Sequence, residues 1–253
     1  MKCRLADMVA SVLILAGQRT GIIDPLCEAA AVSHKAEIPI AGTNMLDRVM
    51  RAIRDAGLPQ PFISGYSGSK AKEAPSGDGP ADSVLLALEH INQFPCLITT
   101  CDHALLTSEM VEHFISGAEK DRSDICVGLA TEEVIQASYP DTKRTYLRFS
   151  DHAVSGCNLF YISNKGGLEA IRFWQSVQHL RKKPFKLARK IGVLIGLKYL
   201  MGKLTLSGAF NYAANRIGIS AAPILLPFAE AAIDVDKISD LEMVESILAR
   251  RME

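Results

Sequence analysis

Short apolar runs alternate with helical patterns along most of this chain, and this alternation constrains its fold most strongly. Six runs have the length and composition of buried strands: Ser11–Leu15, Pro61–Ser64, Cys96–Thr100, Ile125–Leu129, Leu159–Ile162 and Ala222–Leu226. Five segments carry helical patterns: Met45–Ala56, Asp82–Ile91, Ser108–Ala118, Lys165–His179 and Ser239–Arg251. This order is typical of a mostly parallel sheet covered by helices on both faces. We therefore predict an α/β fold with ligands beyond the carboxyl ends of the strands.

Two segments interrupt the alternation. Ser64–Pro80 is rich in Gly, Ser and Pro, which predicts a flexible loop. Arg181–Leu206 is both basic and apolar, which predicts one or two amphipathic helices inserted into the α/β order. No internal repeat and no boundary between domains is evident, so we predict one domain over residues 1–253 with this helical insert at 181–206.

Length and charge narrow the class of protein. The 253 residues suffice for one large α/β domain, and the 28 basic and 28 acidic residues give no global electrostatic case for a nucleic-acid partner. The six cysteines form no CxxC pair, which favours reduced thiols in the cytoplasm over a structural zinc site. The sequence has no recognisable signal peptide and no apolar run of about 18 residues.

The first strand leads into a glycine turn and then a positive charge, "VLILAGQRTG". A turn of this kind lets backbone approach a phosphate, and Arg19 would supply the charge. An ordinary strand-to-helix turn with a solvated arginine is the alternative. Lys35 precedes a second glycine turn, where it is either a solvated lysine or a second charge for a triphosphate.

Carboxylates occur after the central strand and near the C-terminus. Asp102 follows "CLITT", where it could hold Mg²⁺ over a phosphate or simply cap a helix. Asp234 and Asp236 alternate on an extended segment and therefore share one face, and Asp240 starts the last helix. Lys143 and Arg144 form a further basic pair, and Arg144 and Arg148 could bind an anionic second substrate or be solvated.

These motifs together resemble the MobA-like nucleotidyltransferases, a superfamily that includes molybdenum cofactor guanylyltransferase and several cytidylyltransferases. The stretches "LILAGQRTG", "HKAEIPIAGTNMLDRVMRAI", "LITTCDHALLTSEMV", "SGCNLFYI" and "IDVDKISDLEMVE" occur in the family's order, from Val12 to about Met243 and excepting Arg181–Leu206. The resemblance implies a Rossmann-like three-layer sandwich with a mostly parallel mixed sheet. It also implies transfer of NMP from an NTP, CTP or GTP, to a phosphorylated small-molecule acceptor, with Mg²⁺ as cofactor and pyrophosphate as product.

The resemblance also assigns roles to residues. It implies catalytic roles for Arg19, Lys35 and Asp102, and metal binding by Asp102 and Asp236, with Asp234 as the nearby alternative for the latter. The implied nucleotide-binding residues are Leu15, Ala16, Gly17, Gln18, Arg19 and Lys35, to which we add Ser83 at the start of a helix. The implied acceptor-binding residues are Arg144, Gly156 and Asn158.

The sequence departs from the family at several points. Gln18 occupies a position that is usually glycine, and its Cβ disfavours a positive φ there, so the loop is expected to lie differently. The spacer Gly21–His34 is longer than usual. These departures leave open a catalytically inactive nucleotide-binding homologue. A GT-A glycosyltransferase is a further alternative, although its Asp-x-Asp motif is absent after the central strand.

The basic insert is the most individual part of the chain. One interpretation is a helical subdomain or dimer contact with solvated charges. The other is a helix that lies on an anionic membrane. The oligomeric state is left open.

Overall fold

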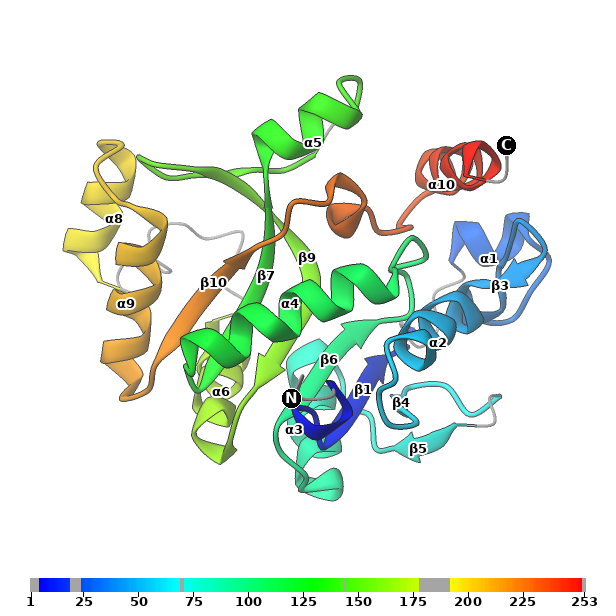
Figure 1. The fold of residues 1–253 in the computed structure, drawn as a ribbon, viewed down its shortest axis with the longest axis horizontal. Helices are drawn as coiled ribbons and strands as arrows, with labels where there is room; N and C mark the ends of the chain where they lie inside the picture. The colour runs from blue at the N-terminus through cyan, green and yellow to red at the C-terminus, as the bar shows by residue number, and fades with distance from the viewer. Residues whose placement is uncertain (1–4, 19–23, 69–70, 143, 178–191, 252–253) are drawn as a thin grey trace.

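The computed structural model describes residues 5–18, 24–68, 71–142, 144–177 and 192–251. Its centre is one mixed sheet with the strand order β10-β7-β9-β6-β1-β4-β5, with β8 paired to β9 (Figure 1). The strands are β1 Ser11–Leu15, β4 Phe62–Ser64, β5 Lys72–Ala74, β6 Cys96–Thr100, β7 Ile125–Thr131, β8 Leu147–Arg148, β9 Ala153–Ile162 and β10 Ala221–Leu225. β9 runs antiparallel to both of its neighbours in this order, and the other pairs along it are parallel.

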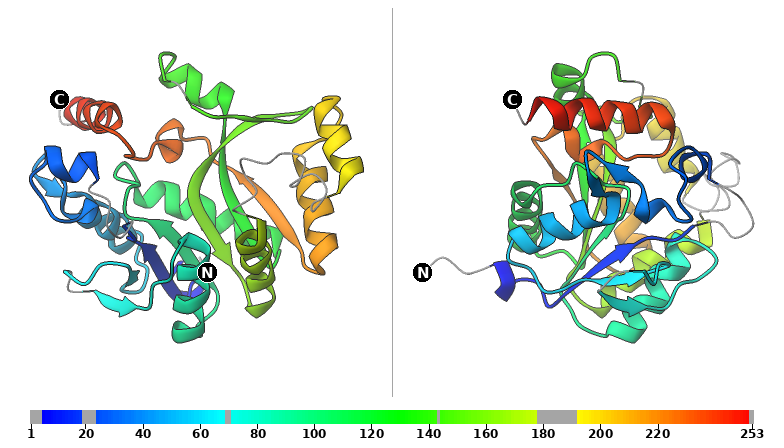
Figure 2. Two further views of the ribbon diagram at one scale, coloured as in Figure 1. Left: turned by 180° about the vertical axis from the view of Figure 1, so that it is seen from behind. Right: turned by 90° about the vertical axis from the view of Figure 1, so that its right-hand side faces the viewer.

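Helices cover both faces of this sheet. α2 (Met45–Asp55) and α4 (Ser108–Asp121) pack together on one face. α3 (Pro80–Ile91), α6 (Leu168–Val177) and α9 (Leu206–Ile217) lie on the opposite face, where α6 contacts both of its neighbours. Figure 2 shows the two helical layers on either side of the sheet. The predicted three-layer α/β sandwich is therefore confirmed.

The buried core explains why the apolar runs became strands. Val12, Leu13 and Ile14 of β1 are at most 1% exposed, because β1 is central and both of its faces are covered. Helix ends follow local signals: Thr107 accepts a hydrogen bond from the Met110 amide at the start of α4, and Gly57 has a φ of +71° just after α2.

A second, smaller cluster brings the C-terminal segment over the N-terminal half of the chain. Short elements form it: α1 (Pro25–Ala29), the 3₁₀ turn η2 (Lys35–Glu37), β2 (Pro39–Ile40) with β3 (Thr43–Asn44), and the final helix α10 (Ile238–Arg250). Ile38 and Ile40 are buried there against Ile233 and Val235. This packing fixes the segment that carries Asp236 beside the segment that carries Lys35.

Several sequence predictions need correction. The predicted loop Ser64–Pro80 contains the edge strand β5, paired in parallel with β4. Within the predicted insert, α8 (Val193–Leu200) is present, and α9 begins at the insert's last residue and continues well beyond it. The part of the insert at 181–191 lies outside the described residues. α5 (Glu132–Ser138) was not predicted.

A search of the described residues finds no helix long and apolar enough to cross a bilayer.

Candidate functional site

The first part of the site is the turn after β1. The Ala16 amide donates to the Ser64 carbonyl at 2.8 Å, so the β1 end stays paired with β4. Gly65, directly after β4, has a φ of +92°, and a Cβ placed on it would lie 2.6 Å from the Gly17 Cα. Two glycines therefore let the two strand ends approach closely and leave backbone at the carboxyl edge of the sheet.

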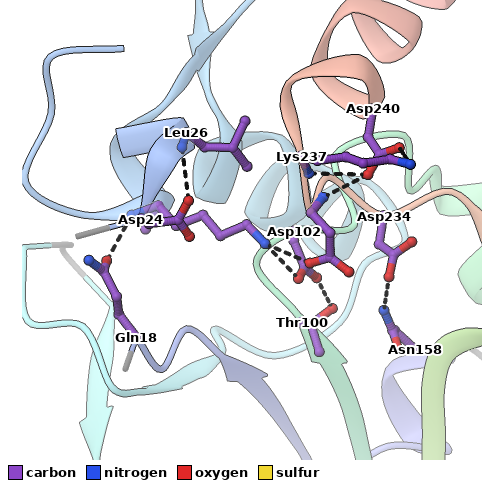
Figure 3. Close-up of polar contacts among 12 residues, drawn as sticks. Gln18, Asp24, Leu26, Thr100, Asp102, Asn158, Asp234, Lys237 and Asp240 are labelled. Carbon is purple, nitrogen blue, oxygen red and sulfur yellow. Dashed lines mark hydrogen bonds and ion pairs between the residues drawn. The ribbon is translucent and has the colours of Figure 1, made fainter. Parts of the chain in front are cut away.

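Gln18 supports the neighbouring lysine segment. Its Oε1 accepts a hydrogen bond from the Lys35 amide at 3.2 Å (Figure 3). Gly17 and Gln18 are both absent from the residues with positive φ in the described chain. The turn therefore does not use the left-handed region at Gln18, and the Cβ of Gln18 causes no backbone strain there.

Asp102 lies beyond the carboxyl end of β6. Thr100, the last residue of β6, donates its hydroxyl proton to the Asp102 carboxylate, and the Asp102 carbonyl accepts the Val235 amide at 3.0 Å. The second contact ties the central strand to the C-terminal segment. Asp234 and Asp236 flank Val235, so both are held at the edge where Asp102 lies.

Lys35 joins the two predicted metal carboxylates. Its Nζ lies 3.3 Å from Asp102 Oδ2 and 2.9 Å from Asp236 Oδ1 (Figure 3). The Lys35 and Asp102 side chains are only 14% and 19% exposed, whereas that of Asp236 is 65% exposed. One cation thus sits between a half-buried and an open carboxylate.

Burial and charge shift the ionisation of this cluster. Burial raises the pKa of Asp102, and the Lys35 ammonium and Thr100 hydroxyl oppose that shift. Burial alone would lower the pKa of Lys35, but Asp102 and Asp236 outweigh it and raise that pKa above its ordinary value. Burial lowers the pKa of the neighbouring His103 to about 4, so His103 adds no charge at neutral pH.

Two pockets border the Lys35 cluster. The first, of about 570 Å³, lies at the ends of β1 and β6, and the start of α3 forms part of its wall. Of the predicted nucleotide-binding residues, it is lined by Leu15, Gly17, Gln18, Lys35 and Ser83. Asp102 also lines it, as does the backbone of Gly77 and Gly79.

The second pocket, of about 980 Å³, lies between α5, β9 and α10. Its walls include the three predicted acceptor residues, Arg144, Gly156 and Asn158, together with Asp234 and Asp236. Six of the remaining lining residues carry hydroxyl groups: Ser138, Tyr139, Thr142, Thr145, Ser155 and Ser239.

Within the second pocket, Asp234 has different partners from Asp236. Arg144 Nη1 lies 3.0 Å from Asp234 Oδ1, and Asn158 Nδ2 lies 3.5 Å from Asp234 Oδ2. Asp234 therefore holds Arg144 and Asn158, and Asp236 is the C-terminal carboxylate that faces Lys35. Asp240 accepts the backbone amides of Asp236 and Lys237, which fixes that turn.

Some predicted residues are not brought together. Ala16 is 1% exposed and is not among the pocket residues, because its amide belongs to the sheet. Arg148 pairs with Glu132 through two contacts of 2.7 and 2.8 Å on the surface and is likewise not among the residues of the acceptor pocket. Arg19 and Lys143 lie outside the described residues.

Sequence reasoning missed the supports of the site. Gly65 carries no signal except its position after an apolar run, and Thr100 was noted only as a strand end. Gly77 and Gly79 fall in the predicted loop, but their close spacing just before a helix is a signal for backbone that lines a pocket.

The donor set fits a magnesium ion that also binds phosphate. No group of three or more His, Cys, Asp or Glu side chains in the described part of the chain is placed to hold a metal by itself. Mg²⁺ commonly takes only one or two protein carboxylates and completes its shell with phosphate oxygens and water. Asp102 and Asp236 already face a single cationic group, so their chemistry matches this mode.

A comparison with family models decides the class. The model of the MobA-like NTP transferase domain matches residues 12–145, more than half of the chain. The chain belongs to this family. It is therefore a nucleotidyltransferase, and the matched region includes β1, Lys35 and Asp102.

Solved structures agree with this assignment. A hypothetical transferase from Thermus thermophilus is 30% identical with a TM-score of 0.80, covering 92% of this chain and 99% of its own. The 2-C-methyl-D-erythritol 4-phosphate cytidylyltransferase from Thermus thermophilus is 17% identical (TM-score 0.52; 96% and 99% covered). Molybdopterin-guanine dinucleotide biosynthesis protein A from Archaeoglobus fulgidus is 14% identical (TM-score 0.52; 95% and 99% covered). The last two likenesses concern the fold alone. No curated protein matches this chain.

Proposed function

We propose that this nucleotidyltransferase moves NMP from CTP or GTP to a phosphorylated small-molecule acceptor and releases pyrophosphate, with Mg²⁺ as cofactor. The observation that carries the proposal is the bridge of Lys35 between Asp102 and Asp236. Asp102 lines one pocket and Asp236 the other, so the cluster lies where two substrates would meet.

The smaller pocket is the nucleotide side. Backbone at Gly17 and Gly79 offers close approach to base and phosphates, and Lys35 neutralises phosphate charge. Arg19 is proposed as the second positive charge. Magnesium, bound by Asp102 and Asp236, would offset negative charge on the α-phosphate.

The larger pocket is the acceptor side. A phosphate oxygen of the bound acceptor attacks the α-phosphorus of the NTP in line. The bond between the α-phosphorus and the oxygen that bridges it to the β-phosphorus breaks, and pyrophosphate leaves with that oxygen. Arg144 and Asn158, both held by Asp234, orient the acceptor. The protein thus works chiefly by positioning and charge neutralisation.

The charge arrangement supports this reaction over glycosyl transfer. The turn after β6 reads Cys101-Asp102-His103 and offers one carboxylate, not an Asp-x-Asp pair. In the Asp-x-Asp pattern at Asp234–Asp236 the two carboxylates do not act as a pair, because Asp234 is bound by Arg144 whereas Asp236 faces Lys35. Retention of Lys35, Asp102 and Asp236 in one cluster also favours an active enzyme over an inactive homologue.

A pyrophosphate-release screen tests the proposal. Purified protein, Mg²⁺ and either CTP or GTP are combined with phosphorylated polyols, sugars and pterins, and products are identified by mass spectrometry. Pyrophosphate and a nucleoside-diphosphate conjugate in equal amounts would support the proposal. A pyrophosphate yield with no conjugate would indicate hydrolysis, and transfer of a sugar from a nucleotide sugar would support glycosyl transfer instead.

A further inference from the structure

The surface of α8 combines exposed leucines with two exposed lysines, Lys198 and Lys203. Leu194, Leu197, Leu200 and Met201 are 77, 51, 82 and 50% exposed, and we call these four residues the α8 patch. They make up half of the large hydrophobic residues exposed in the described chain. Large apolar side chains gathered at one place on a surface indicate a contact site.

The exposed apolar side chains of α8 lie on one side of the helix. At about 100° per residue, the four side chains of the α8 patch fall within roughly a third of the helix circumference. Tyr199 lies on the opposite side, where its ring packs on Phe149 with centroids 5.7 Å apart and its hydroxyl accepts the Arg148 amide at 3.3 Å. Protein contacts thus hold one side of α8, and its leucine side is exposed. α8 itself lies at the edge of the molecule in Figure 1.

β8, which contacts the Tyr199 side of α8, carries a further exposed leucine. Leu147, the residue before Arg148, is 55% exposed. The hairpin of β8 and β9 is also anchored to the segment after α8, since the Ser150 amide donates to the Leu204 carbonyl at 2.8 Å. The α8 patch is therefore connected through this hairpin to β9, whose residues Ser155 and Gly156 line the acceptor pocket.

The stretch of sequence that contains α8 carries only positive charges. Residues 170–229 contain ten basic residues and no Asp or Glu, and four of the ten lie in the described part of the chain: Arg172, Lys198, Lys203 and Arg216. Because the whole chain has zero net charge, the rest carries a net charge of −10. Lys198 and Lys203 lie within and just after α8, and both are exposed.

We infer that the α8 patch docks on an anionic lipid bilayer. Lipid chains would receive the four apolar side chains, and acidic head groups would attract the exposed Lys198 and Lys203. A second copy of this chain fits the surface less well, because two such faces would bring like charges together. Phosphate groups of a nucleic acid would match the charge but leave the leucines without an apolar partner. The inference does not depend on the proposed transfer reaction.

Vesicle co-sedimentation of the full chain tests this inference. Phosphatidylcholine vesicles with about 30% phosphatidylglycerol are compared with pure phosphatidylcholine at roughly 50 and 500 mM salt, a range over which screening of surface charge becomes strong. We expect the protein to pellet with the anionic vesicles at low salt and at least about tenfold less at high salt or without the acidic lipid. Absence of pelleting, or equal binding to neutral vesicles, would overturn the inference.

Variants separate the apolar and charge contributions. The triple change Leu194→Ser, Leu197→Ser and Leu200→Ser and the double change Lys198→Glu and Lys203→Glu should each lower vesicle partitioning at least about tenfold. Leu86→Ser, an exposed leucine on α3, is the matched control and should leave partitioning unchanged. Binding by both multiple variants at the wild-type level would contradict the inference.

Two further measurements keep the result interpretable. Thermal melts with and without nucleotide report the fold and the nucleotide site, and we expect both to be unchanged by the triple variant. Sedimentation velocity reports self-association. A wild-type dimer that the triple variant converts to monomer, with no vesicle binding by either, would assign the α8 patch to a second copy and overturn the inference.

Discussion

Lys35 Nζ lies 2.9 Å from Asp236 Oδ1, although 201 positions separate the two residues in the sequence. The contact exists because the segment before α10 packs on η2 and β2 through buried Ile38, Ile40 and Val235. It places the ammonium group where two carboxylates converge. A metal ion and this ammonium group would therefore favour the same position, and binding of one should affect the other.

Replacement of Lys35 tests that competition. We expect Lys35→Gln to bind Mn²⁺, used as a probe for Mg²⁺, at least about tenfold more tightly without nucleotide, because a positive charge within about 4 Å of the ion costs several kcal/mol at an effective dielectric near 20. Electron paramagnetic resonance measures free Mn²⁺. Lys237→Gln is the control, since Lys237 lies beside the cluster and is not part of the bridge. Weaker Mn²⁺ binding by Lys35→Gln would contradict this account.

Asp102 should matter for turnover and not for folding. Asp102→Asn keeps the size and the contact with Thr100 but removes a charge, so we expect the transfer rate to fall by about 10²–10³, the usual loss for one preorganised electrostatic group. The far-ultraviolet spectrum and the melting temperature should stay near wild type. Asp55→Asn, a surface change, is the control. A transfer rate near that of wild type would refute the role proposed for Asp102.

The glycine pair at the turn can be tested with a matched pair of alanines. Gly65→Ala places a Cβ 2.6 Å from Gly17 Cα, whereas Gly57→Ala meets no atom within 4 Å at a similarly positive φ. Both should lose about 1–2 kcal/mol from the left-handed backbone alone. Only Gly65→Ala should also weaken nucleotide binding, by at least about tenfold, because it displaces the turn. Equal nucleotide affinity in both variants, measured by calorimetry, would argue against this role of the close approach.

Asp124 predicts a pH dependence of stability away from the site. Its carboxylate accepts the Ser220 amide and hydroxyl at 2.8 Å each and the Asn164 amide group at 2.7 Å, which together hold its pKa below the ordinary value. A lowered folded pKa stabilises the protein above the unfolded pKa, and this stabilisation is lost as the pH falls through the folded value. We expect Asp124→Asn to cost about 1–3 kcal/mol at pH 7.

Urea unfolding between about pH 7 and pH 3 measures this dependence. The gap between wild type and Asp124→Asn should narrow below about pH 4. A gap that is constant over the whole range would show that the charge of Asp124 contributes nothing.

The buried central strands could be predicted from the sequence. β1 and β6 match their predicted ranges residue for residue, because central strands of a covered sheet are continuous apolar runs. β5 was missed because "KEA" is polar and pairs only at the edge of the sheet. α9 was missed because its start merged with the predicted insert and Gly208 lies in its first turn, where it weakens the helical pattern.

The site could be predicted as a set of residues but not as a geometry. The order of the motifs indicated Lys35, Asp102 and Asp236. Their contact, however, depends on how distant segments of the chain pack together, which no local sequence pattern predicts. The same limit explains Arg148, whose charge is satisfied by Glu132 on the surface. The single-domain assignment and the cytoplasmic location stay predictions.

The most direct test of the central claim is a thermal-shift measurement with CTP, GTP, UTP and ATP, each with and without Mg²⁺, on wild type and Asp102→Asn. We predict that CTP or GTP stabilises the wild type only with Mg²⁺, by about 2.7 kcal/mol at a hundred times the dissociation constant. Asp102→Asn should lose the dependence on Mg²⁺. A nucleotide shift that is the same with and without Mg²⁺, or no shift with any nucleotide, would contradict a magnesium nucleotide site at this cluster.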